Sequence, residues 1–246
     1  MITPDQGYFF GMGAFETVAV EEGNPIFLKE HYERLFRAME FLHLKLSADE
    51  LEEKVGKALG DPFMKTGRKV LKITASEKNL LITTRENTYE EKHYEKGFTT
   101  DFSCVRRNET SPFTYHKTLN YGDCLREKHL AHNRGIDEPV FLNTKGIIAE
   151  GATTNVFFVK NGDIFTPSVE CGLLPGIMRD YICGKNHVWE KDIYPEEIEE
   201  FEEMFLTNSL LGVMPVAVLG RYQFPSRSVS QSLLEVYKEK ISMRDR

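Results

Sequence analysis

The sequence predicts a two-lobed α+β protein, with a small N-terminal α/β lobe and a larger, β-rich C-terminal lobe. Apolar residues recur at helical spacing over residues 29–43, which indicates an amphipathic helix in the first half. Strand–turn–strand patterns occur at 70–84 and again at 154–166, so both halves contain a sheet. A polar run over residues 106–112 has the composition of a connecting loop between the two halves.

We place the lobe boundary inside this polar run, which predicts lobes at residues 1–107 and 108–246. A chain of 246 residues is long enough to bury a sizeable core and to build two lobes around a shared cleft.

The composition is that of an ordinary globular protein, with 41% hydrophobic and 28% charged residues. The net charge of −7 and the calculated pI of about 5.6 provide no basic field for nucleic acid. An anionic ligand would therefore need a locally basic pocket.

The cysteines and the apolar segments both favour the cytoplasm. The four cysteines form no C-x-x-C pair, so we expect reduced thiols, and the histidines show no metal-binding spacing. The N-terminus lacks a basic segment followed by an apolar core, as a signal peptide would have. The most apolar late stretch, 210–219, is too short to span a bilayer, and we expect no membrane association.

The N-terminal segment 5–17 is rich in glycine and aromatic residues and leads into a predicted strand at Val18–Val20, followed by a hairpin turn at Glu22–Asn24. Gly11-x-Gly13 lacks the third glycine of a dinucleotide fingerprint and has no strand before it. We interpret it as a turn whose backbone must approach something closely.

The predicted helix 29–43 carries two polar residues, His31 and Arg34, at the edge of its apolar stripe. Arg34 could pack its stem on the core with its charged head in water, or it could reach across the edge into a cleft.

The remaining predicted elements follow in order. In the first half they are a helix at Ala48–Leu59, strands at Val70–Thr74 and Leu80–Thr84, an exposed loop at Glu86–Lys96 and a strand at Phe98–Val105. In the second half they are a helix at Tyr121–Asn133, strands at Glu138–Leu142, Thr154–Lys160 and Asp163–Thr166, and a loop and helix start at Leu173–Arg179. The chain finishes with the segment Met204–Ser209, the apolar stretch Leu210–Leu219 and a helix ending near Arg244. Asn161-Gly162 is a strong hairpin turn signal.

Three features carry candidate chemistry. Lys117 lies in the aromatic and amide-rich stretch Tyr115–Tyr121, where burial would lower the pKa of its amine and free it to attack a carbonyl, although most lysines are simply solvated. Glu150 ends an apolar strand beside the small-residue turn 151–155; it could be a cap or a salt-bridge partner, or it could hold a cationic ring nitrogen. The third feature is Gly176–Met178. The sequence predicts a helix start here, and the first residues of a helix offer free backbone N–H groups to an anion, although Pro175-Gly176 could simply form the turn.

Thr207–Ser209 adds small hydroxyl and amide donors at a strand end. Together these groups provide an amine for an aldehyde, an acid for a pyridinium and donors for a phosphate, which is the set that pyridoxal 5'-phosphate (PLP) needs.

Five ordered segments of the chain resemble fold-type IV PLP enzymes, a group that includes branched-chain aminotransferases, D-amino-acid aminotransferases and 4-amino-4-deoxychorismate lyases. The matching segments span nearly the whole chain and are Phe10–Thr17, His31–Leu35, Lys117–Tyr121, Glu150–Asn155 and Leu174–Arg179. The resemblance implies a two-lobed fold with the cofactor between the lobes, and a homodimer with its active sites near the interface.

The resemblance also implies a role for each matching residue. Lys117 would carry the cofactor covalently, Glu150 would contact the pyridine nitrogen and Arg34 would bind the phosphate. The further cofactor contacts implied are Tyr121, Thr154, Ile177, Met178, Asn208 and Ser209.

Within the group, the stretch Phe205–Val216 looks like the lyase version, which converts aminodeoxychorismate to 4-aminobenzoate and pyruvate in folate biosynthesis. The two carboxylates of that substrate need cations, and Arg85 and Arg107 are the candidates, although either could be a loop arginine facing water. Two alternatives stay open: an aminotransferase that uses a 2-oxo acid, and a non-catalytic PLP-binding protein of the same fold.

Overall fold

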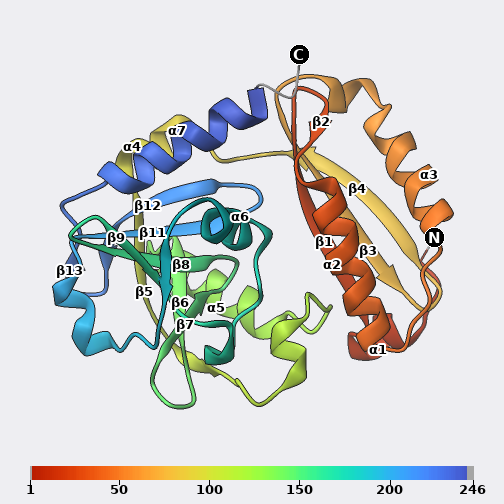
Figure 1. The fold of residues 1–246 in the computed structure, drawn as a ribbon. Coiled ribbons are helices and arrows are strands. Elements are labelled where there is room, and N and C mark those ends of the chain that lie inside the picture. Colours follow the sequence, from red (N-terminus) through yellow and green to blue (C-terminus); the bar gives the residue numbers. More distant parts are fainter. Residues whose placement is uncertain (1, 243–246) are drawn as a thin grey trace. The chain divides into compact units, whose positions relative to one another are not determined.

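The computed structural model describes residues 2–242 and divides the chain into two compact units (Figure 1). The first unit contains the chain up to Thr88 together with the short segment His116–Tyr121. The second unit contains Tyr89–Tyr115 and the rest of the described chain, from Gly122 to Ser242.

This division differs from the predicted boundary at residue 107. The strand β5 (Phe98–Arg107) pairs in parallel with two strands of the larger sheet, and it therefore belongs to the second unit. The segment His116–Tyr121 returns to the first unit, so Lys117 lies outside the lobe in which the sequence analysis placed it.

The first unit is built on an antiparallel sheet in the order β2-β1-β3-β4. Its strands are β1 (Gly13–Glu21), β2 (Asn24–Pro25), β3 (Arg68–Ser76) and β4 (Leu80–Glu86). Three helices complete the unit: α1 (Gln6–Phe10), α2 (Leu28–Phe41) and α3 (Ala48–Leu59), with a 3-10 turn at Pro62–Lys65. The core is formed by α2 and α3 against one sheet face, with Val18, Leu35, Leu51 and Leu71 buried (Figure 1).

The second unit contains a nine-stranded mixed sheet in the order β10-β9-β8-β11-β12-β5-β6-β7, with β13 paired to β12. After β5, its strands are β6 (Glu138–Asn143), β7 (Ile148–Gly151), β8 (Asn155–Lys160), β9 (Asp163–Thr166), β10 (Val188–Glu190), β11 (Glu203–Asn208), β12 (Gly212–Leu219) and β13 (Tyr222–Gln223). Its α-helices are α4 (Glu91–Lys96), α5 (Gly122–His132), α6 (Ile177–Lys185) and α7 (Ser228–Ser242).

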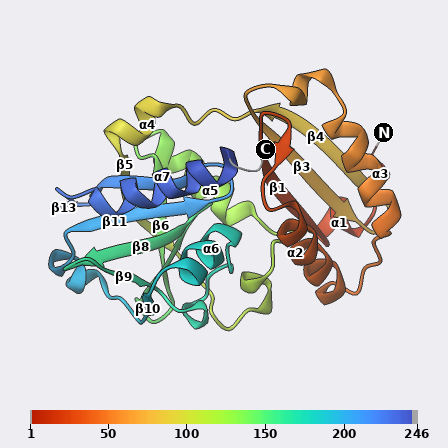
Figure 2. The same cartoon turned by 45° about the horizontal axis from the view of Figure 1, so that its top comes forward.

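Aromatic side chains fill the centre of the second unit. Phe141, Phe157, Phe158 and Phe205 are among its largest fully buried residues, and the rings of Phe157 and Phe205 stack with centroids 4.8 Å apart. Helix α7 packs on β11 and β12 (Figure 2).

Most of the predicted elements are found, with two differences. The charged run Glu86–Lys96 was expected to be a loop, but its second part forms α4, because the Tyr94 ring is buried and its hydroxyl donates to Leu211 O at 2.8 Å. The end of the last helix, expected near Arg244, lies outside the described residues. Within residues 2–242, no helix combines the length and apolar character needed to cross a bilayer.

Candidate active site

The segment that carries Lys117 is attached to the sheet of the first unit by main-chain hydrogen bonds. Phe15 N donates to Lys117 O at 3.0 Å, and Leu119 N donates to Gly13 O at 2.8 Å. These two bonds extend the sheet beside the first residues of β1, so the backbone of Lys117 is fixed although it lies in a loop.

The close approach expected from Gly11-x-Gly13 is made to this same segment. A Cβ atom at Gly13 would lie 2.6 Å from Ala75 O and 2.8 Å from the Leu119 side chain. Gly11 has φ +71°, and its carbonyl accepts from Asn120 Nδ2 at 3.0 Å. Glycine is therefore needed at both positions to bring the lysine segment against β1.

The Lys117 ammonium lies between two aromatic rings. Its Nζ is 4.5 Å from the ring centroid of Phe15 and 5.1 Å from that of Tyr121. The two rings meet edge to face with centroids 5.1 Å apart. Aromatic faces attract a cation while displacing water from it, so this amine is held in one place and only half exposed.

A buried ionic cluster lies on the other face of β1. Arg34 Nε and Nη2 donate to the two carboxylate oxygens of Glu16, each at 2.7 Å, and His31 Nδ1 lies 2.6 Å from Glu16 Oε2. The side chains of Glu16 and His31 are fully buried, and that of Arg34 is 8% exposed. This fork-to-fork geometry is the strongest form of an arginine–carboxylate pair.

The charge states in this cluster follow from its geometry. Burial opposes ionisation of Glu16, but the attraction and hydrogen bonds of Arg34 and His31 outweigh it and lower the pKa of the carboxyl well below its usual range. Burial lowers the pKa of His31 more than Glu16 raises it. The second ring nitrogen of His31, Nε2, is buried without a hydrogen-bond partner in the described chain, which also favours the neutral imidazole.

The sequence left two alternatives open for Arg34, and the first of them, a charged head in water, is wrong. Its guanidinium is bound to Glu16 beneath β1. The role implied for it, as a ligand of the cofactor phosphate, remains a prediction.

The sheet face opposite the helices carries basic side chains among polar and apolar ones. Lys72 lies beside Thr17 and Thr83 on this face, and its Nζ is 5.0 Å from the centroid of the Phe15 ring that Lys117 also contacts. Arg85 lies on the same face by register and is exposed, with Nη1 donating to Glu86 O. The substrate-binding role expected for Arg85 stays a prediction, and Lys72 is a second cation on the same face.

In the second unit, Glu150 lies in β7 with its side chain only 7% exposed. Arg107 Nη2 lies 2.6 Å from Glu150 Oε1, and Leu174 N donates to Glu150 Oε2 at 3.0 Å. Arg107 was expected to bind a substrate carboxylate. In the structure its guanidinium pairs with the carboxylate of Glu150, and the substrate-binding role stays a prediction.

The turn that follows Glu150 is held by a second buried carboxylate, that of Glu138. Glu138 is fully buried and accepts hydrogen bonds from Lys128 Nζ, from Thr153 N and from Thr154 Oγ1. Asn208 Nδ2 donates to Thr153 O at 3.1 Å. The side chains of Thr154 and Asn208, both implied as cofactor contacts, therefore position this turn.

Two further groups of donors lie near this turn. Gly176 begins α6 without a side-chain cap, so the backbone of Ile177 and Met178 forms an uncapped helix start. A side chain at Gly176 would collide with the amide of Asn155, which holds the helix start close to β8. Beside Ser209, the Thr207 hydroxyl is buried without a hydrogen-bond partner among the described residues.

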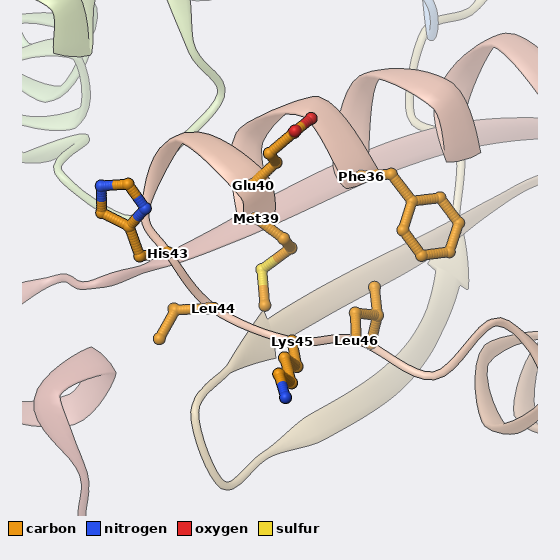
Figure 3. A pocket seen from close by; sticks show the side chains of 7 residues that line it. All are labelled: Phe36, Met39, Glu40, His43, Leu44, Lys45 and Leu46. Carbon is orange, nitrogen blue, oxygen red and sulfur yellow. The ribbon is translucent and has the colours of Figure 1, made fainter.

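None of these residues lines the open surface depression shown in Figure 3. That depression lies at the end of α2 and is lined by Phe36, Met39, Glu40, His43, Leu44, Lys45 and Leu46. The candidate residues are thus organised by their hydrogen bonds within each unit and not by this pocket.

The model of the class IV aminotransferases matches residues 13–219, most of the chain. The chain belongs to this family. The match runs from Gly13, which lies beside Leu119, to the last residue of β12.

Several proteins of known or assigned class are similar to this chain over most of its length. The aminodeoxychorismate lyase of Bacillus subtilis is 30% identical, over 96% of this chain and 88% of that protein. A probable branched-chain-amino-acid aminotransferase of Thermotoga maritima is 33% identical, over 85% of this chain and 78% of that protein. A putative 4-amino-4-deoxychorismate lyase of Legionella pneumophila has the same fold, with a TM-score of 0.85 at 24% identity, covering 97% of this chain and 96% of that one.

Members of the class IV family use PLP, and the residues described here fit that cofactor. The first unit supplies an amine held between aromatic rings. The second unit, taken by itself, has a buried carboxylate, a helix start without a side-chain cap, and a Thr207 hydroxyl for which residues 2–242 provide no hydrogen-bond partner. Such groups are suited to a ring nitrogen and a phosphate.

Three residues of these networks were missed by the sequence analysis, although each has a signal in the pattern. Glu16 alternates with Ala14 and Val18 on the core-facing side of β1, where an unpaired carboxylate would be costly. Lys72 occupies an outward position in a strand whose neighbours are buried. Glu138 begins a strand that is buried along its whole length.

Proposed function

We propose that this chain is a PLP-dependent 4-amino-4-deoxychorismate lyase that forms 4-aminobenzoate and pyruvate. The observation that carries the proposal is its similarity to the Bacillus subtilis aminodeoxychorismate lyase, which extends over 96% of the chain. The lyase-like sequence of β11, β12 and the turn between them supports the same choice.

The residues that would hold the cofactor are those that the family resemblance implies. Lys117 would carry it covalently and Glu150 would face its ring nitrogen. Phosphate donors would come from Arg34, from the backbone of Ile177 and Met178, and from Ser209, while Thr154 and Asn208 shape the turn beside Glu150. When bound, PLP supplies an electron sink for the charge that develops on the substrate carbon.

Lys117 would then act as the base of the reaction. Its Nζ, once released from the cofactor, would take the proton from the amine-bearing carbon of the substrate. The enolpyruvyl group leaves as pyruvate, and the ring becomes aromatic, which provides a large driving force. Every atom of the substrate is recovered in the two products, so no co-substrate is needed.

The test is to incubate the PLP-loaded protein with aminodeoxychorismate in the absence of any 2-oxo acid. We expect 4-aminobenzoate and pyruvate in equal amounts over many turnovers. If a protein with a normal cofactor absorption forms neither product, the lyase proposal is wrong.

The second candidate is an aminotransferase, which the 33% identity to the Thermotoga maritima protein favours. The same residues would hold the cofactor, but turnover would require both an amino donor and a 2-oxo acid. Steady production of 4-aminobenzoate without an acceptor separates the two activities, because only the lyase can sustain it.

Two cations on the open face of the first-unit sheet suit a substrate with two carboxylates. We expect Lys72→Met to raise KM for aminodeoxychorismate by about 10- to 100-fold, the effect of losing one hydrogen bond to a charged group. Lys78→Met, in the exposed turn between β3 and β4, is the matched control and should leave KM unchanged. An unchanged KM in Lys72→Met would remove Lys72 from the substrate site.

We further propose that the protein is a homodimer. Helix α1 exposes Tyr8, Phe9 and Phe10 by 67%, 63% and 71%, and their rings contact one another. An exposed aromatic cluster of this kind usually marks an interface, and a second copy of the chain offers the same surface in return.

Light scattering coupled to size exclusion should give twice the chain mass. Replacing Phe9 and Phe10 with serine should shift the protein to the monomer, while Trp189→Ser, at another exposed aromatic residue, should not. A monomeric natural protein, or a dimer that survives the double replacement, would refute this interface.

A further inference from the structure

We propose that Arg107 is a positioning residue, which holds Glu150 as an anion so that the ring nitrogen of bound PLP keeps its proton. The inference rests on the proposed function, since it requires PLP beside Glu150. It gives Arg107 a role that differs from the substrate-binding role expected from the sequence.

The pairing of Arg107 with Glu150 is built into the sheet. Arg107 is the last residue of β5 and pairs in register with Asn143 of β6. Glu150 lies in β7 and pairs with Phe141 of β6. The two side chains therefore meet across β6, with the Arg107 guanidinium 5.8 Å from the ring centroid of Phe141 and 2.6 Å from Glu150 Oε1.

Both partners are withdrawn from water and have additional contacts. The side chain of Arg107 is 17% exposed and that of Glu150 is 7% exposed. Glu150 Oε2 accepts from Leu174 N at 3.0 Å, while Arg107 Nη1 lies 3.6 Å from Cys124 Sγ. Breaking the pair would leave a charge without its partner in a mostly dry setting, which is strongly unfavourable.

The two oxygens of the Glu150 carboxylate have different protein partners. Arg107 Nη2 lies beside Oε1, and Leu174 N donates to Oε2. Because each carboxylate oxygen has two lone pairs, one oxygen can accept from a protein donor and from a protonated ring nitrogen at the same time.

Arg107 is suited to this task because a guanidinium stays charged at any pH at which the enzyme works. Its charge stabilises the anionic form of Glu150, so the proton shared between Glu150 and the ring stays on the ring. A charge within about 4–6 Å typically changes such a proton balance by about 10- to 1000-fold. The ring acts as an effective electron sink only in its protonated form.

The experiment uses the holoenzyme loaded with PLP that carries 15N at the ring nitrogen. We expect the 15N resonance of the natural protein to report a protonated ring. In Arg107→Met it should move toward the unprotonated position, with a loss of kcat of about tenfold or more and little change in KM. Arg107→Lys, which keeps the charge without the fork, should lie between the two.

Arg106→Met is the matched control, because Arg106 is the exposed neighbour on the same strand and should leave the spectrum unchanged. An unchanged 15N resonance in Arg107→Met together with a raised KM would overturn the inference and return Arg107 to the substrate site. If Arg107→Met does not fold, the comparison of Arg107→Lys with the natural protein decides in the same way. Failure of the proposed function would differ from all of these outcomes, because the natural protein would then bind no PLP or would fail to form 4-aminobenzoate.

Discussion

Lys117→Ala should abolish turnover and the absorption of the covalently held cofactor. The variant loses both the amine that would hold PLP and the base that would move the substrate proton. Loss of the proton-transfer function alone typically costs about 10²- to 10⁴-fold in rate, and loss of the covalent attachment adds to it. The measurement is the visible spectrum of the PLP-loaded protein, followed by the rate of 4-aminobenzoate formation.

Lys72→Ala is the control for this experiment, because Lys72 contacts the same Phe15 ring as Lys117. It should keep the cofactor absorption, since its role is assigned to the substrate. A Lys117→Ala protein that retained both absorption and turnover would show that another amine does the chemistry.

Glu16→Gln should be the most destabilising conservative change in the first unit. It leaves the mostly buried Arg34 guanidinium without its anion and removes the partner of His31. Breaking one side of a buried ion pair costs about 3–5 kcal/mol, which is a large fraction of the stability of an ordinary domain. Denaturant unfolding of the protein without cofactor, at pH 7, measures the loss.

The pH dependence of this loss follows from the direction of the pKa shifts. The pKa of Glu16 is lowered in the folded protein, so its stabilising effect is full above the unfolded value near 4.5 and is lost as the pH falls below it. The difference between the natural protein and Glu16→Gln should therefore shrink below pH 4.5.

The lowered pKa of His31 acts at higher pH. The unfolded chain takes up a proton near its ordinary value of 6.5 while the folded protein does not, so the stability of both proteins should fall as the pH drops through that value.

Glu33→Gln is the matched control on the same helix. Glu33 is 53% exposed and lies 3.8 Å from Lys29, so its loss should change the free energy of unfolding by no more than about 0.5 kcal/mol. Two results would contradict the charge assigned to Glu16. One is an equal loss of unfolding free energy in Glu16→Gln and Glu33→Gln. The other is a loss in Glu16→Gln that does not change with pH.

Much of the fold could be predicted from periodicity, because the elements concerned have one buried face. The helix 29–43 and the hairpin at 154–166 are examples, and the turn at Asn161-Gly162 has the positive φ values that its residues favour. Helix α4 was missed because its six residues are too few to show a period, and the contact that fixes it, from Tyr94 to Leu211, spans more than a hundred residues.

The partners of the site residues could not be predicted for the same reason. The sequence indicates that Glu150 needs a cation or a donor. Arg107 is separated from it along the chain by helix α5 and strand β6, and it becomes the partner only through the order of β5, β6 and β7 in the sheet. Arg34 shows the same limit: its position on the edge of α2 was evident, whereas its pairing with Glu16 depends on the register of β1 beneath the helix.

The attachment of Lys117 to β1 has a consequence for synthesis on the ribosome. Strand β2 covers only the end of β1, at Val20 and Glu21, so until residues 117–119 are made the backbone of Gly13 and Phe15 lacks the partners that it has in the finished protein. This edge of β1 thus stays open while the roughly one hundred residues between β1 and Lys117 are synthesised, and an open strand edge can pair wrongly with another nascent chain. The edge is closed only when the segment that contains Lys117 has been made.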